Sequence, residues 1–308
     1  MFSITEGGNK SYPIAIIQSG PYKNDKIYLE RPERIDKTKQ WVDLKKYKLI
    51  PYLYSGPEGQ RVITYISGPS GSGKSTLAGE YAMTFVKDQT EHIKKRKAEA
   101  RAEAKALGLD PKAIKETPDT PDVFILSLKD SKQDPAYAKL NPIQIKLDQS
   151  IVGDKNRIKL SEFPDNCLVI FDDIGTIADR EVEREVELLA NSLMQIARYR
   201  NIHMIITTHV TNENKPFYKV LMTELHNYVF FPSSGATKPI KYCLNTYFDL
   251  NTKEIKKVID LGSDRDYSWT LVKRTNPQLI MNPHGVEILK HFLENKEHDI
   301  QDESTNDD

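Results

Sequence analysis

Short apolar runs bounded by polar residues recur along the chain, and each of them predicts a strand. Runs that are apolar throughout are typical of parallel strands covered on both faces of a sheet. Five such runs lie at residues 61–67, 123–128, 168–171, 204–207 and 228–231. Shorter runs at 12–18, 26–29 and 269–272 predict further strands outside this series.

Helical periodicity occurs between these runs. Apolar residues recur on one face of a helix at Val182, Val186, Leu189, Leu193 and Ile196. A helical pattern also covers residues 74–87, and we expect a short helix at 286–294. Because strands alternate with helices, the pattern predicts an α/β fold with a mainly parallel central sheet flanked by helices.

Changes in composition predict three parts of the chain. Residues 1–60 are mixed in character and predict an N-terminal extension with short strands. Residues 61–281 hold the alternating strands and helices of the core, and 282–308 predict a helix followed by an acidic tail. The tail has few apolar residues to bury, so we expect it to be disordered.

A charged insert interrupts the core at about residues 90–121. Residues 90–107 have high helix propensity but almost no apolar stripe, so we expect a helix that projects into solvent or meets a charged partner. Residues 92–116 hold eight Lys and Arg against four Asp and Glu. The insert either neutralises nucleic-acid phosphates, or is a solvated helix or a docking arm for another protein.

Composition and charge exclude several classes of protein. The 308 residues carry 44 Lys and Arg against 44 Asp and Glu, so binding of nucleic acid needs a local basic patch. We expect no membrane span, because no run approaches about 18 apolar residues. The two cysteines, Cys167 and Cys243, form no CxxC motif, which argues against a zinc site or a disulfide scaffold and favours an intracellular, reducing setting.

A phosphate-binding loop follows the first strand of the core. Gly68-Pro69-Ser70-Gly71-Ser72-Gly73-Lys74-Ser75 matches the G-x-x-x-x-G-K-[ST] pattern, and Thr76 follows inside the predicted helix. Glycines let backbone N–H groups approach phosphate oxygens, and the helix N-terminus favours negative charge. Lys74 is expected to reach the β- and γ-phosphates of ATP, and the Ser75 hydroxyl to ligate Mg²⁺.

Two carboxylates end the strand at 168–171. Asp172 is placed to hold Mg²⁺, directly or through water. Asp173 can orient the attacking water or accept its proton, or it can cap the next helix. A hydrolase needs a carboxylate that activates water, whereas a nucleotide kinase does not, so the pair favours hydrolysis.

Further candidates surround the next strand. Thr208 and His209 follow it, and a polar group at this position can sense the γ-phosphate or the attacking water. Four arginines are candidates for an arginine finger, a side chain that reaches the nucleotide site of a neighbouring subunit. These arginines are Arg180, Arg184, Arg198 and Arg200. Arg198 and Arg200 can equally interact with the C-terminal dipole of their own helix.

Three stretches together resemble the genome-packaging ATPases of large eukaryotic DNA viruses and virophages, which belong to the FtsK/HerA group of P-loop motors. They are residues 68–75, 168–173 and 198–209. Residues 125–145, Trp269-Thr270-Leu271-Val272 and Pro277-Gln278 are also similar to that family. The resemblance covers about residues 61–281.

The resemblance implies a sheet ordered 5-1-4-3-2 and a homo-oligomeric ring of five or six subunits. It implies hydrolysis of ATP with Mg²⁺, coupled to the movement of double-stranded DNA into a capsid together with capsid vertex or portal proteins. Such a protein works in the host cytoplasm or a viral factory, or in the virion. Carried over by motif, Lys74 and Asp173 are catalytic, and Ser75 and Asp172 form the metal site.

This sequence departs from the family at two points. Many relatives have Glu where Asp173 stands, and Gln or Asn where Thr208 or His209 stands. Two other functions remain open from the residues: a nucleotide-dependent assembly switch without translocation, and a nucleotide kinase.

Overall fold

The computed structural model describes residues 2–3, 12–29, 41–43, 48–52, 61–110, 118–130, 134–209, 215–233, 237–263, 269–274 and 278–290. The chain forms two compact units, one made of Met1–Ser72 with His209–Asp308 and the other of Gly73–Thr208. The unit of Gly73–Thr208 contains most of the predicted site.

A parallel sheet forms the centre of this unit. Its order is β10-β9-β7-β8, and all three pairings are parallel. The strands are β7 (Val123–Ser127), β8 (Ile143–Lys146), β9 (Leu168–Phe171) and β10 (His203–Thr208). Every residue of β9 is fully buried, as expected of an apolar strand covered on both faces.

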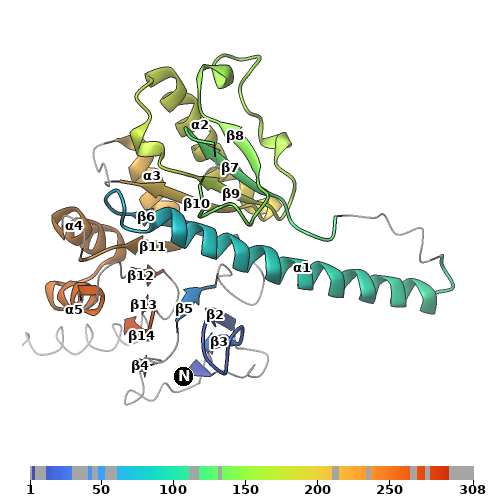
Figure 1. Ribbon diagram of the computed structural model, residues 1–308, viewed down its shortest axis with the longest axis horizontal. Helices are drawn as coiled ribbons and strands as arrows, with labels where there is room; N and C mark the ends of the chain where they lie inside the picture. The colour runs from blue at the N-terminus through green and yellow to red at the C-terminus, as the bar shows by residue number, and fades with distance from the viewer. Residues whose placement is uncertain are drawn as a thin grey trace, which may run out of the picture. The chain divides into compact units, whose positions relative to one another are not determined.

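One helix joins two segments that the sequence analysis treats separately. α1 (Lys74–Ala106) runs without a break from the phosphate loop through the charged insert. Its first half packs on the sheet through residues such as Leu77, Tyr81 and Phe85, which are buried. Its second half extends beyond the strands of the unit (Figure 1), and most of its side chains are exposed.

The second helix of this unit confirms the predicted amphipathic face. α2 (Arg180–Ile196) buries Val182, Val186 and Leu189, and Leu193 is fully buried, whereas the side chain of Ile196 lies outside the described residues. Asp179 precedes the helix, and its Oδ1 accepts hydrogen bonds from the N–H groups of Glu181 and Val182. Short 3₁₀ turns complete the unit at Gln149–Ile151, Leu160–Glu162, Ile174–Thr176 and Ala197–Arg200.

The other unit contains a mixed sheet of order β4-β14-β13-β12-β11-β6. β11 pairs in parallel with β6, and the remaining pairings are antiparallel. The strands are β4 (Trp41–Asp43), β6 (Ile63–Ser67), β11 (Asn227–Phe230), β12 (Thr270–Lys273), β13 (Gln278–Asn282) and β14 (Gly285–Lys290). The predicted N-terminal extension thus contributes β4 to this sheet.

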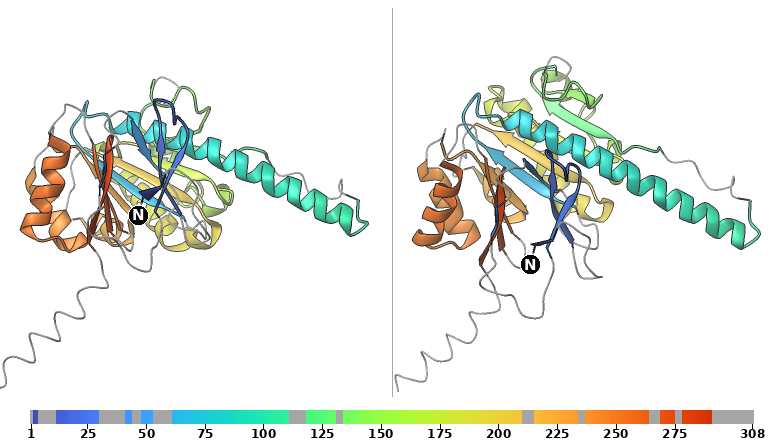
Figure 2. Two further views of the ribbon diagram at one scale, coloured as in Figure 1. Left: turned by 90° about the horizontal axis from the view of Figure 1, so that it is seen from below. Right: turned by 60° about the horizontal axis from the view of Figure 1, so that its bottom comes forward.

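A small antiparallel sheet and three helices complete that unit. The small sheet has the order β1-β3-β2-β5, with β1 (Phe2–Ser3), β2 (Tyr12–Ile17), β3 (Lys26–Leu29) and β5 (Leu49–Pro51). The helices are α3 (Pro216–Glu224), α4 (Thr237–Phe248) and α5 (Thr252–Ser263). Figure 2 shows α4 and α5 side by side next to β12 and β13.

The structure matches the predicted sheet in several respects and corrects the C-terminal part. The predicted order requires the pairs β11–β6, β10–β9 and β9–β7, and each is present. The helix expected at 286–294 is wrong, because residues 285–290 form β14. Val286, Glu287 and Ile288 are all buried in this strand, and Glu287 pairs with Lys257. The predicted acidic tail lies outside the described residues.

None of the helices within the described ranges is long and apolar enough to span a membrane.

Candidate functional site

The N-terminus of α1 provides the phosphate-binding end of the candidate site. Gly73 precedes the helix with φ 99°, a left-handed conformation that side chains other than glycine rarely adopt. In the described structure around Gly73, no side chain caps the helix and no acidic residue occupies its first turn. This end of α1 therefore favours an anion.

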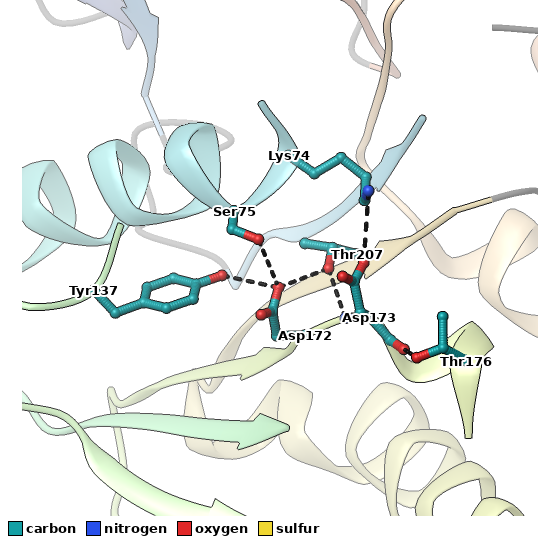
Figure 3. Close-up of polar contacts among 7 residues, drawn as sticks. All are labelled: Lys74, Ser75, Tyr137, Asp172, Asp173, Thr176 and Thr207. Atoms are coloured by element: carbon teal, nitrogen blue, oxygen red, sulfur yellow. Dashed lines mark hydrogen bonds and ion pairs between the residues drawn. The ribbon is translucent and has the colours of Figure 1, made fainter. Parts of the chain in front are cut away.

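Three hydroxyl groups converge on one carboxylate oxygen at the end of β9. Oδ1 of Asp172 accepts hydrogen bonds from Thr207 Oγ1 at 2.9 Å, from Tyr137 Oη at 3.0 Å and from Ser75 Oγ at 3.4 Å (Figure 3). These donors come from β10, from the loop after β7 and from the first turn of α1. The tertiary fold thus brings to Asp172 residues that lie 35 to 97 positions from it in the sequence.

Burial and charge control the protonation of this cluster. Burial raises the pKa of Asp172, and the charge of Asp173 raises it further, whereas the hydrogen bonds from Thr207 and Tyr137 oppose the shift. Burial also raises the pKa of Tyr137 well above its ordinary value, and the neighbouring Asp172 carboxylate adds to that increase. Tyr137 therefore remains a hydrogen-bond donor at neutral pH.

Asp173 has a left-handed backbone that its neighbours hold in place. Its φ is 52°, a conformation that aspartate tolerates better than most residues. Its N–H donates to Thr207 Oγ1 at 2.8 Å, and its carbonyl oxygen accepts from Thr176 Oγ1 at 2.8 Å. Its Oδ1 lies 3.6 Å from Nζ of Lys74, which is almost completely buried (Figure 3).

A close approach between α1 and the loop after β7 positions Tyr137. A Cβ atom on Gly79 would lie 2.2 Å from the carbonyl oxygen of Ala136, so only glycine fits at this position of α1. The loop is fixed by Asp134, whose Oδ1 accepts from the N–H of Ala136 at 2.9 Å. Tyr137 follows directly and is buried, with its hydroxyl on Asp172.

The donor set at Asp172 fits a magnesium ion. Mg²⁺ in nucleotide sites takes oxygen ligands from one or two protein groups and completes its shell with phosphates and water. Ser75 Oγ and Asp172 Oδ1 supply a hydroxyl and a carboxylate next to the N-terminus of α1. A cation would also compensate the buried charge of Asp172.

The β10 residue that contacts the two aspartates is Thr207, which directly precedes the expected candidates Thr208 and His209. Thr208 is fully buried, and adjacent residues of a strand point to opposite faces. Thr207 and Thr208 therefore point to different faces of the sheet, and Thr207 contacts both aspartates. Tyr137 and Gly79 are further site residues that no local sequence pattern predicts.

Arg200 is held within its own chain. Its guanidinium donates to Asp165 Oδ1 at 2.6 Å and to the carbonyl of Leu160 at 2.7 Å, and also to the carbonyl of Phe163. These bonds give Arg200 a structural role. Arg180 and Arg184 are exposed on α2, and the side chain of Arg198 lies outside the described part of the structure.

Comparisons with known proteins give one relative over almost the whole chain. No protein-family model matches the chain. It is similar to "Uncharacterized protein V3" of Sputnik virophage, with 31% identity over 290 residues that cover 94% of this chain and 100% of that protein. The resemblance to virophage proteins inferred from the sequence is confirmed by this relative.

Solved structures are similar at lower identity. One is B204, the DNA-packaging ATPase of Sulfolobus turreted icosahedral virus, with 13% identity, a TM-score of 0.39, and coverage of 72% of this chain and 96% of that one. Another is the pCW3 conjugation coupling protein TcpA with ATPγS, with 12% identity, a TM-score of 0.42, and coverage of 92% and 80%.

Proposed function

We propose that this chain, which belongs to the same family as protein V3 of Sputnik virophage, is an ATPase that moves double-stranded DNA into a viral capsid. One observation carries the ATPase assignment: Ser75, Asp172 and Asp173 gather beside Lys74 at an uncapped helix N-terminus that begins at Gly73. This is the arrangement that a magnesium–triphosphate complex needs.

The residues of the phosphate loop bind the nucleotide in this proposal. Residues 68–76 surround the phosphates, and Lys74 interacts with the β- and γ-phosphates. Ser75 and Asp172 would hold Mg²⁺, which supplies positive charge to the phosphate oxygens when bound. Because Lys74 faces Asp173 at 3.6 Å, a γ-phosphate competes with that carboxylate for the lysine.

Asp173 is the group that activates water. Its carboxylate is about one third exposed, and its backbone is held on both sides by Thr207 and Thr176. A fixed carboxylate beside the γ-phosphate position can orient a water molecule and accept its proton. Thr207 connects the two aspartates, so it replaces Thr208 and His209 in our proposal as the residue that reports on hydrolysis.

The motor function rests on the resemblance of the nucleotide motifs to packaging ATPases. We infer a homo-oligomeric ring of five or six subunits that acts on double-stranded DNA with capsid vertex or portal proteins. The ring would work in the host cytoplasm or viral factory, or in the virion. The exposed Arg180 and Arg184, together with Arg198, are the candidates for an arginine that reaches a neighbouring site.

A titration of ATPase rate with double-stranded DNA, with particle size measured alongside, tests the proposal. We expect phosphate release without an added acceptor, an increase in rate with DNA, and particles larger than a monomer. Turnover that requires a nucleotide acceptor would instead identify a kinase. Turnover that DNA does not change, in an assembled particle, would identify an assembly switch and remove translocation from the proposal.

A further inference from the structure

The second half of α1 has one face that is partly buried. Gln89 and Ala104 are buried, and Ile93 and Ala100, which lie between them on the same side of the helix, are half-buried. Lys97 lies beside this face, and its Nζ donates to Oδ1 of Asp119 in the returning chain. This side of the helix is therefore already occupied.

A different face carries three exposed basic residues, two of which, Lys94 and Arg101, lie close enough to Asp119 for their charges to lower its pKa. Lys94, Arg101 and Lys105 are exposed, and their spacing of seven and four residues places them in one stripe along the helix. Exposed Ala98 and Ala102 lie between or beside them. We call Lys94, Arg101 and Lys105 the basic face; it is about 16 Å long at 1.5 Å per residue.

Negative charge lies on another side of the same helix. Glu99 and Glu103 are four residues apart, and their side chains are turned well away from the basic face. Lys95 lies near them and pairs with Glu99 at 4.0 Å. Between residues 94 and 105 the acidic side chains therefore lie away from the basic face, although the formal net charge of the whole chain is zero.

We propose that the basic face of α1 binds the phosphate backbone of double-stranded DNA without reading its sequence. This inference rests on the proposed function, in which DNA is the moving substrate. Phosphate contacts need Lys and Arg side chains on a surface that a backbone can approach, and the small alanines allow that approach. The face carries no aromatic side chain that stacks on bases, and phosphates can satisfy all of its Lys and Arg side chains, so we expect a contact that is independent of sequence.

The composition of the face favours nucleic acid over a protein partner. Interfaces between proteins depend on large anchors such as aromatic residues in their centre. Between residues 94 and 105, all of which the structure describes, the exposed face presents only charged residues and alanine. The exposed apolar residues Leu107 and Leu109 follow the end of the helix and lie outside the face.

The position of the face on α1 connects it with the nucleotide site. Lys74 and Ser75 lie in the first turn of the helix, and Lys105 lies near its end. The two ends are separated by about 46 Å of one continuous helix at 1.5 Å per residue. A change in the position of α1 when nucleotide binds therefore moves the basic face with it.

Matched pairs of substitutions test the proposal in the full-length protein. Lys94→Gln/Arg101→Gln removes two charges from the basic face, and Lys95→Gln/Arg96→Gln removes two exposed charges from other sides of the helix. Binding to a labelled DNA duplex is measured by fluorescence anisotropy at several salt concentrations. ATPase rate without DNA and particle size are measured for each variant.

We expect the slope of log affinity against log salt to fall by about 1.8 for Lys94→Gln/Arg101→Gln, which corresponds to two lost phosphate contacts. The matched control should keep nearly the wild-type slope, and both variants should keep the basal ATPase rate. If the slope falls equally in the two variants, net charge alone explains the effect, and the proposal is overturned.

The remaining outcomes separate this inference from the proposed function. If the wild type binds DNA and neither variant changes the slope, the basic face is not the DNA contact, while the motor proposal stands. A changed particle size with an unchanged slope would make the face a contact between copies of the chain and overturn the inference. If the assembled wild type does not bind DNA, the translocation function fails and the inference fails with it.

Discussion

Nζ of Lys74 lies 3.6 Å from Oδ1 of Asp173, so the lysine of the phosphate loop and the second aspartate of β9 face each other directly. Lys74 is almost completely buried, whereas Asp173 is about one third exposed. Each residue therefore has a charged partner before nucleotide binds. A triphosphate must separate this pair, and the consequences differ for the two residues.

Asp173→Asn should separate hydrolysis from binding. The substitution removes the group that accepts a proton from water, which is a contribution of about 10²–10⁴ in rate. It also removes a negative charge that competes with the γ-phosphate for Lys74, so ATP should bind at least as tightly as in the wild type. Phosphate release and titration with a fluorescent ATP analogue measure the two effects. A wild-type rate would exclude Asp173 as the activating group.

Lys74→Ala should weaken nucleotide binding. Hydrogen bonds from a charged donor contribute about 1.5–3 kcal/mol each, so we expect affinity for ATP to fall by about 10- to 100-fold. Lys95→Ala, an exposed lysine on the same helix, is the control and should bind as the wild type does. Unchanged ATP affinity in Lys74→Ala would contradict the assignment of the phosphate loop.

A buried lysine in the other unit should make stability depend on pH. Burial lowers the pKa of Lys273 from 10.5 to about 8. Between these values the unfolded chain binds a proton that the folded chain does not, so stability should rise as pH increases from 8 to 10.5. At neutral pH the burial of Lys273 therefore lowers the free energy of unfolding by about 3 kcal/mol, at 1.36 kcal/mol per pKa unit.

Lys273→Met should remove the loss of stability caused by the buried lysine and so raise the melting temperature at pH 7. It should also reduce the increase in stability between pH 8 and 10. Melting curves of variant and wild type at pH 7, 8.5 and 10 measure the difference. A variant that melts lower than the wild type at pH 7 would show that the lysine is stabilised by its surroundings.

Local sequence patterns were sufficient to predict the parts of the fold that depend on local properties. The phosphate loop is contiguous, and the aspartates follow a strand whose residues are all apolar, so local patterns predict both. The same reasoning failed at residues 286–294, where Val286 and Ile288 alternate with Glu287 within a strand too short to separate from a helix by period alone.

The missing site residues depend on tertiary contacts. Tyr137 reaches Asp172 only because Gly79 allows the loop after β7 to approach α1, and no local pattern encodes that contact. The choice between Thr207 and Thr208 depends on which face of β10 each one occupies. A sequence supplies the alternation within a strand, but only the packed sheet shows which side faces the site.

Arginines should differ in how they affect activity in mixed assemblies. Arg200 forms three hydrogen bonds within its own chain, so Arg200→Ala should lower the melting temperature, and mixtures with wild type should lose activity in proportion to dilution. The candidates for an arginine that acts on a neighbouring subunit are tested as Arg180→Ala, Arg184→Ala and Arg198→Ala. If one of them acts in this way, mixing the variant with wild type should lower ATPase activity more than dilution alone predicts. If activity falls in proportion to the variant fraction for all three, neither α2 nor the turn that follows it supplies an arginine finger.

Tyr137→Phe should change the magnesium requirement without removing the fold. The phenol donates one of three hydrogen bonds to Oδ1 of Asp172, and its ring remains in the phenylalanine. Outer groups that orient a metal ligand typically contribute about 10–100-fold in metal affinity, so we expect the Mg²⁺ concentration for half-maximal nucleotide binding to rise by about tenfold or more. The effect should be smaller at saturating Mg²⁺.

The control for Tyr137→Phe is Tyr81→Phe, because Tyr81 is also fully buried but lies further along α1. Binding of a fluorescent nucleotide at a series of Mg²⁺ concentrations is measured for both, together with the melting temperature. If the hydroxyl of Tyr137 positions Asp172, only Tyr137→Phe shifts the Mg²⁺ dependence, and excess Mg²⁺ restores binding. An equal shift in both variants, or a loss that Mg²⁺ does not restore, would make Tyr137 a packing residue whose hydroxyl has no role at the site.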